Sequence, residues 1–191
     1  MKPEERTIPI HKPRIIEMLF FFSCGIIMSI PITLFVRSLV DPLLTNFTQI
    51  TATLLSYALF APFIEEFSKI FPLYYRHGET QRSILNLAIM VGLGFAIVEL
   101  LQYVFLLGVP VIFRLAGLFF HSSSTAIAAY GIATKRPAPF YLLAVALHFS
   151  YNFLALINPF PFTAAYLIVG IAVSLAYTFY GRTKEKVIQY S

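Results

Sequence analysis

Long apolar runs, separated by short polar connections, dominate the chain from residue 15 onwards. A helix needs about 20 predominantly apolar residues to cross a bilayer core, and six runs reach that length. They cover about residues 15–36, 48–74, 84–107, 111–133, 138–157 and 162–181. The pattern predicts an all-α fold class: a polytopic membrane protein with a bundle of about six transmembrane helices, forming one domain over residues 1–191.

Local features refine the first run, the connection that follows it and the third run. The first run is too long for a signal-peptide core and lacks an Ala-x-Ala cleavage site, so it is interpreted as a span. Pro31 is a candidate kink within it, and residues 37–46 are predicted to form a loop. In the third run, Gly92 and Gly94 are predicted to let a neighbouring helix approach closely.

Composition supports a membrane location. The chain is 58% hydrophobic and 12% charged, with a mean hydropathy of +0.77, whereas soluble domains carry about 25% charged residues. The net charge is +5, but the basic residues stand at the ends of apolar runs, as topology determinants do, so nucleic-acid binding is excluded. Cys24 is the single cysteine, so the chain has no intrachain disulfide.

Lysine and arginine alternate between successive connections. The N-terminal segment holds four, the second and fourth connections two each, and the C-terminal tail three. The first connection holds Arg37 alone, and the third and fifth hold none. Because basic residues are retained on the cytoplasmic side, this alternation predicts a multi-pass cell-membrane protein with both termini in the cytoplasm.

The strongest departure from the apolar pattern is the cluster Glu65-Glu66-Phe67-Ser68-Lys69 in the second run. An ionisable side chain at a helix centre costs about 2.5–3.5 kcal/mol on insertion scales. Glu65 and Glu66 lie about 100° apart on a helix, so they cannot both face one point, and Lys69 is within reach of either. We expect Lys69 to hold one glutamate while the other faces a partner elsewhere. The alternative is an interfacial charge cluster that only ends a helix.

Further polar side chains interrupt the third, fourth and fifth runs: Glu99, Arg114, His121, His148 and Asn152. Each has a structural alternative: Glu99 would pair with Arg114, a histidine would bond between helices, and Asn152 would join helices by its amide. Phe95, one turn before Glu99, is most simply a core aromatic. A folded bundle does not need this many buried ionisable groups, so their joint presence argues for a functional site.

Carboxylates and histidines that meet in a dry cavity suit two chemistries. A glutamate in an apolar pocket deprotonates water, while a histidine and an asparagine amide donate to the developing oxyanion. Zinc with an open water position uses the same residue types. The spacing His-Glu-x-x-His is missing, so metal ligands would come from separate helices. The serines at 122–124 lie in no nucleophile motif, which disfavours an intramembrane serine protease. The candidate zinc ligands are Glu65, Glu99, His121 and His148.

Four motifs on separate runs carry a family resemblance: Glu65-Glu66-x-x-Lys69, Phe95-x-x-x-Glu99, Phe120-His121 and His148-x-x-x-Asn152. In this order they resemble the PrsW family of intramembrane proteases, relatives of the CAAX prenyl endopeptidases and bacteriocin-processing proteins. The resemblance covers the second to fifth runs. The CAAX enzymes have an arginine after the glutamate pair and a histidine where Glu99 stands, so Lys69 and Glu99 match the PrsW branch.

The resemblance implies an endopeptidase that hydrolyses a peptide bond of a membrane-associated substrate in or beside the bilayer. Anti-sigma factors are one substrate class of the family. The reaction would use a glutamate-activated water, with a bound zinc ion or with no cofactor. Glu65 is predicted to be the general base, and Lys69 to hold Glu66. The implied catalytic residues are Glu65, Glu66, Glu99, His121, His148 and Asn152, supported by Lys69 and Phe95.

Two other functions remain as alternatives. A small proton-coupled carrier would use the glutamates and histidines as a relay, although the chain shows no evident inverted repeat and no matching pair of broken helices. A catalytically silent membrane scaffold would keep the fold and the buried cluster without turnover.

Overall fold

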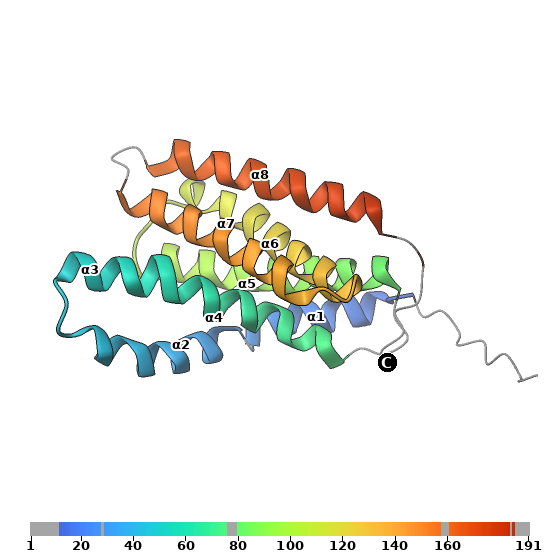
Figure 1. Ribbon diagram of the computed structural model, residues 1–191, viewed down its shortest axis with the longest axis horizontal. Coiled ribbons are helices and arrows are strands. Elements are labelled where there is room, and N and C mark those ends of the chain that lie inside the picture. The colour runs from blue at the N-terminus through green and yellow to red at the C-terminus, as the bar shows by residue number, and fades with distance from the viewer. Residues whose placement is uncertain (1–11, 28, 76–79, 158–160, 184, 186–191) are drawn as a thin grey trace, which may run out of the picture.

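The computed structural model describes residues 12–27, 29–75, 80–157, 161–183 and 185 of the 191-residue chain. Among these residues the regular structure is helical, and the predicted all-α fold class is confirmed. Consecutive spans run in opposite directions (Figure 1). Within the described part of the chain, six helical segments are long and apolar enough to cross a membrane: Ile15–Leu44, Gln49–Tyr75, Gln81–Phe105, Val111–Ala133, Pro137–Ile157 and Ala164–Arg182.

The first span is longer than predicted, because helical structure continues beyond residue 36. Pro31, the candidate kink, lies within α2 (Ser29–Val40), inside a span that extends to Leu44. Arg37 Nη2 lies 3.7 Å from Asp41 Oδ2 one turn later, which favours a helix where a loop was predicted for residues 37–46. The span consists of α1 (Ile15–Ile27), α2 (Ser29–Val40) and the 3₁₀ turn η1 (Asp41–Leu44).

The second span departs from α-helical geometry twice. Its first turn is capped by Thr48, whose hydroxyl accepts a hydrogen bond from Thr51 N at 3.3 Å. Pro62 and Pro72 lack the N–H that an uninterrupted α-helix needs. The helix is a π-helix just before Pro62 and a 3₁₀-helix around Pro72. The segments are α3 (Gln49–Thr53), the π-helix η2 (Leu54–Phe60), α4 (Ala61–Ile70) and the 3₁₀ turn η3 (Phe71–Tyr75).

The remaining spans are more regular. The third begins three residues earlier than predicted, because Thr80 caps it by accepting a hydrogen bond from Ser83 N at 3.1 Å. Pro137 and Pro161 begin the fifth and sixth helices, where a missing N–H costs no hydrogen bond. The elements are α5 (Gln81–Phe105), the short η4 (Val111–Phe113), α6 (Leu115–Ala133), α7 (Pro137–Ile157) and α8 (Pro161–Arg182).

Helices α5 and α6 form the centre of the bundle. Helix α5 packs against α1 and α6, and α6 also packs against α7 and α8. A side chain at Gly94 would collide with the backbone of α1, and one at Gly92 with the backbone of α6 beside His121. The predicted close approach at both glycines is confirmed. It brings the α6 segment that carries His121 directly against α5.

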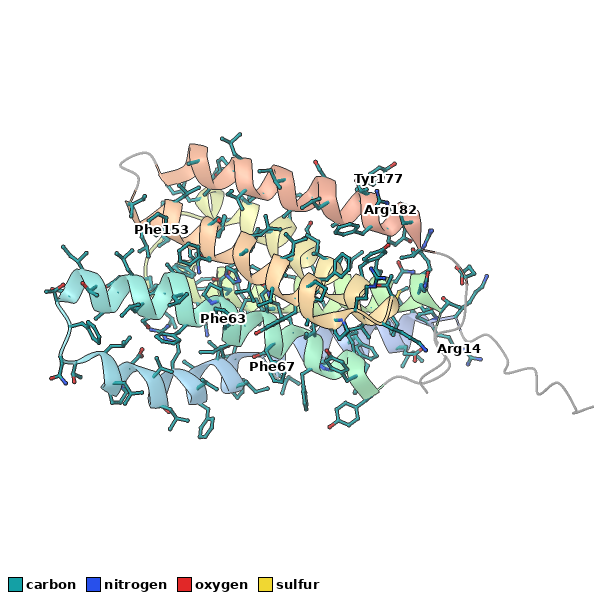
Figure 2. All side chains as sticks on the ribbon, viewed as in Figure 1. Arg14, Phe63, Phe67, Phe153, Tyr177 and Arg182 are labelled. Carbon is teal, nitrogen blue, oxygen red and sulfur yellow. The ribbon has the colours of Figure 1, made fainter. Side chains whose placement is uncertain are left out.

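Both described ends of the chain lie at the same end of the bundle. Arg82, at the start of α5, donates to the backbone oxygen of Thr183 at 2.8 Å and to its hydroxyl at 2.7 Å. Figure 2 shows Arg14 and Arg182 together at this end, with Phe153 of α7 toward the other. Lys2, Arg6, Arg76, Lys184 and Lys186, which entered the topology prediction, lie outside the described residues.

Candidate active site

The buried centre of the bundle contains an ion pair on α4. Glu66 and Lys69, one turn apart, are fully buried, and Lys69 Nζ lies 2.6 Å from Glu66 Oε1. Each charge alone would carry a large desolvation cost at this depth, and the pair neutralises both. Of the two adjacent glutamates, the structure therefore pairs Glu66 with the lysine.

The ammonium group of Lys69 also connects α4 to α6. It lies 3.1 Å from His121 Nδ1 and 3.3 Å from Ser124 Oγ, so all three of its N–H groups have acceptors. The ring of Phe95 stands 5.0 Å away and adds a cation–π contact. Because an ammonium group only donates, Nδ1 of His121 must accept, which places the ring proton on Nε2.

That ring proton points to a second acidic group. Nε2 of His121 lies 2.8 Å from Glu99 Oε2, and the other oxygen of Glu99 lies 3.0 Å from Arg114 Nη2. The sequence left open whether Glu99 joins the histidines or pairs with Arg114, and the structure shows that it does both. Phe95 packs against the His121 ring at 4.9 Å between centroids, so this core aromatic also borders the site.

His148 on α7 stands between the two adjacent glutamates. Its Nδ1 lies 2.8 Å from Glu66 Oε1, and its Nε2 lies 3.6 Å from Glu65 Oε2. As expected, Lys69 holds one glutamate, Glu66, while Glu65 faces a partner on another helix, His148, which contacts Glu66 as well. Because imidazole presents nitrogens on two edges, carboxylates about 100° apart on α4 reach the same ring.

A cavity of about 180 Å³ opens beside this network. Glu65 and Glu99 line it, whereas Glu66, Lys69 and both histidines lie behind its wall. The Oε2 atom of Glu65 is buried and has no hydrogen-bond partner among the described residues. The walls come from α2, the η2–α4 segment, α5, the start of α6 and α7. They include Thr33, Arg37, Tyr57, Gln102, Tyr103, Arg114 and Asn152.

Asn152 also lines the cavity, one turn after His148 on α7. Its Nδ2 donates to the backbone oxygen of Tyr57 at 2.9 Å, so one of its two N–H groups joins α7 to the π-helix η2. A π-helix bonds each carbonyl to the N–H five residues later, and for Tyr57 that residue is Pro62, which has no N–H, so this oxygen is available. The amide was predicted to point into the groove. Asn152 lines the cavity, but one of its N–H groups also joins two helices.

Sequence reasoning did not assign a role to Ser124 or Tyr57. Ser124 follows His121 by three residues, so the two share a helix face, and this spacing could have identified Ser124 as a site residue. Tyr57 contributes its backbone oxygen, and only Pro62 hinted that the helix there departs from α geometry. The structure brings all the predicted site residues to the network or to the cavity wall.

A profile of the PrsW family of intramembrane metalloproteases matches residues 13–178. The chain belongs to the PrsW family. It is therefore a peptidase and a multi-pass membrane protein, with a peptide as its substrate. Searches of curated proteins and of solved structures found no match. The match includes the first span and most of the sixth, beyond the four spans on which the sequence motifs lie.

The metal that this family description implies fits one group of residues. Glu65, His121 and His148 each offer a ligand atom, and the three atoms lie within 4.8 Å of one another. Two histidines and a glutamate are the ligands of zinc in some peptidases. The unpartnered Glu65 Oε2 is an available ligand, and a hydrogen bond from His148 Nδ1 to Glu66 leaves Nε2 free for a metal.

Two neighbours complete this assignment. Glu99, a fourth predicted ligand, lies outside the three-residue group and contacts His121 instead, as carboxylates do behind metal-binding histidines. His121 has both nitrogens engaged, by Lys69 and by Glu99, so it would bind a metal only after releasing one of them.

Proposed function

We propose that this PrsW-family chain is an endopeptidase in which Glu65 activates water to attack a peptide bond of a membrane-associated substrate. One observation carries the proposal: Glu65 lines the cavity, and its buried Oε2 has no hydrogen-bond partner among the described residues. A carboxylate in this position can accept a proton from a water molecule that also reaches the substrate carbonyl.

The residues behind Glu65 hold it in place and supply charge balance. Lys69 neutralises Glu66, and Glu66 accepts a hydrogen bond from His148, which fixes the orientation of that ring. The opposite edge of His148 faces Glu65 and can share the proton that Glu65 takes from water. If zinc binds, Glu65, His121 and His148 would hold it, and Glu65 Oε2 would act as a ligand in place of its role as the base. The ion would then supply a Lewis acid that polarises the substrate carbonyl and makes water more acidic.

Purified protein tests this function directly. We expect the full-length chain in detergent or nanodiscs to cleave a tagged single-span peptide, with new termini identified by mass spectrometry. Zinc content and cleavage are measured again after treatment with a chelator. Loss of both would show that turnover needs the metal, and full activity in metal-free protein would show that water is activated without it. A pure, monodisperse wild type that cleaves no membrane peptide would contradict the proposal.

Asn152 is proposed to stabilise the oxyanion with the N–H that Tyr57 does not use. We expect Asn152→Ala to lower kcat by about 10²–10³, the usual effect of losing one such donor, with little change in KM. The thermal midpoint should change little, since one interhelical hydrogen bond contributes about 0.6 kcal/mol on average in membranes. Steady-state kinetics and a melting curve measure both. A fully active variant, or one inactive only because it unfolds, would leave Asn152 as a helix-joining residue.

The proposed orientation places both termini in the cytoplasm. The cavity is lined by the second half of the first span, the first half of the second and the last turns of α5 and α7, so it lies toward the end opposite the termini. It would then open on the outer side, where an extracytoplasmic segment of a membrane protein, such as an anti-sigma factor, could enter.

Reporter fusions test this orientation. A reporter that is active only in the cytoplasm should be active after Ser191 and inactive at Gly108, and a reporter active only outside should give the opposite result. The expectation follows from the distribution of basic residues. The reverse pattern at both positions would overturn it.

A further inference from the structure

One face of α2 forms a wall of the cavity. Ile30, Thr33, Leu34 and Arg37 all line it, and their spacing of three, one and three residues places them on a single side of the helix. Glu65 lines the same cavity from α4. Helix α2 therefore brings two apolar side chains, a threonine and a cation to the space beside the proposed base.

The hydroxyl of Thr33 has an unusual environment. Its Oγ1 is buried and has no hydrogen-bond partner among the described residues. Hydroxyls inside apolar helices commonly donate to the carbonyl four residues earlier. Several in this chain do so, at 2.7–2.9 Å: Ser23 to Leu19, Ser68 to Ile64, Ser150 to Ala146 and Thr178 to Ser174. A buried hydroxyl without a partner carries a desolvation cost that an acceptor in the cavity would remove.

Arg37, one turn after Thr33, supplies the charge. Its guanidinium lies 4.4 Å from the ring centroid of Tyr57, and its Nη2 lies 3.5 Å from Ser56 Oγ and 3.7 Å from Asp41 Oδ2. The distances to Ser56 and Asp41 are long for hydrogen bonds from a guanidinium, which carries five N–H donors. Arg114, the other arginine in the cavity wall, already contacts Glu99 at 3.0 Å. Arg114 is neutralised by a close carboxylate, whereas the nearest carboxylate to Arg37 lies 3.7 Å away and is partly exposed, so Arg37 keeps more of its charge for a new anionic partner.

We propose that Arg37 and Thr33 bind a carboxylate of the peptide substrate, either an Asp or Glu side chain or the free C-terminus. The guanidinium supplies charge-assisted hydrogen bonds and the hydroxyl donates one more. Glu65 and Glu99 repel the same group, so the carboxylate binds at the α2 side and the peptide runs from there toward Glu65. This inference rests on the proposed function, since it names a feature of the substrate of that site.

A binding measurement tests the subsite independently of turnover. The protein is the full-length Glu65→Gln variant in nanodiscs, and the probes are fluorescent apolar peptides in matched pairs. In one set a single position is Glu or Gln, scanned along the peptide. In the other the C-terminus is a free acid or an amide. We expect one acidic form to bind about tenfold more tightly than its neutral partner, the effect of one charge-assisted interaction.

Substitutions assign that preference to α2. Arg37→Gln should abolish it, Thr33→Val should reduce it several-fold while Thr33→Ser retains it, and Arg37→Glu should favour a Lys peptide. Arg82→Gln is the matched control, because Arg82 also stacks on a tyrosine, at 4.2 Å from Tyr180, but at the other end of the bundle. It should keep the preference.

The outcomes separate the subsite from the catalytic proposal. Equal binding of all acidic and neutral pairs, or a preference that survives Arg37→Gln, would overturn the carboxylate subsite. Tighter binding of a Glu peptide than of its Gln partner would identify the ligand as an acidic side chain. Tighter binding of the free acid than of the amide would identify it as the C-terminus of the peptide. A wild type that binds the acidic peptide as expected but cleaves none would contradict the proposed reaction and leave the subsite supported.

Discussion

Replacing Glu65 by glutamine is expected to lower kcat for peptide cleavage by about 10²–10⁴, the usual contribution of a general base. The amide keeps the size of the side chain but cannot take a proton from water. Because Glu65 lies at the cavity wall and its Oε2 has no hydrogen-bond partner among the described residues, the fold should tolerate the change. Cleavage of a tagged peptide by purified protein, with a melting curve on the same sample, measures both effects.

Glu17→Gln is a suitable control for this prediction. Glu17 lies in the first turn of α1, at the end of the bundle away from the cavity, and its removal should leave turnover unchanged. A folded Glu65→Gln variant with near wild-type kcat would show that another group is the general base. Glu99 would be the next candidate, because it is the other carboxylate in the cavity wall.

Replacing Lys69 by methionine is expected to destabilise the protein by about 3–5 kcal/mol, since it leaves the buried carboxylate of Glu66 without its cation. The same change made together with Glu66→Gln should restore most of that loss, because the remaining amide carries no charge. Unfolding in mixed micelles measures the free energy for the wild type, both single variants and the double variant.

Lys135→Met is the control for the loss of a lysine charge that is not buried. Lys135 is exposed in the connection between α6 and α7, and its loss should change the free energy of unfolding by less than about 0.5 kcal/mol. If the effects of the Glu66 and Lys69 substitutions simply add in the double variant, the two side chains do not stabilise each other and the pair is not an energetic unit.

The six spans followed from the sequence because a bilayer imposes one strong rule. Each span must satisfy its own backbone in a helix and cover itself with apolar side chains, so length and composition were sufficient. The ionisable residues that break this pattern were found for the same reason. Gly92 and Gly94 were also predictable, because closely packed membrane helices need small residues at their contact.

The loop predicted for residues 37–46 was wrong for residues 37–44, which continue α2 and form the 3₁₀ turn η1, while residues 45 and 46 do form a turn. Proline fits the first turn of a helix as well as it fits a loop. The continuation of α2 matters for the site, because it carries Thr33 and Arg37 along the cavity wall.

Sequence alone determined that this chain is a helical membrane protein with glutamates, histidines and a lysine buried in its spans, because burying each of them requires compensation. Only the tertiary structure decided which groups compensate one another. Helix packing placed His148 between Glu65 and Glu66, joined Lys69 to His121, and left Glu65 at the cavity. These contacts connect residues 52 to 83 positions apart, and their geometry depends on the rotation and tilt of whole helices, which no local pattern specifies.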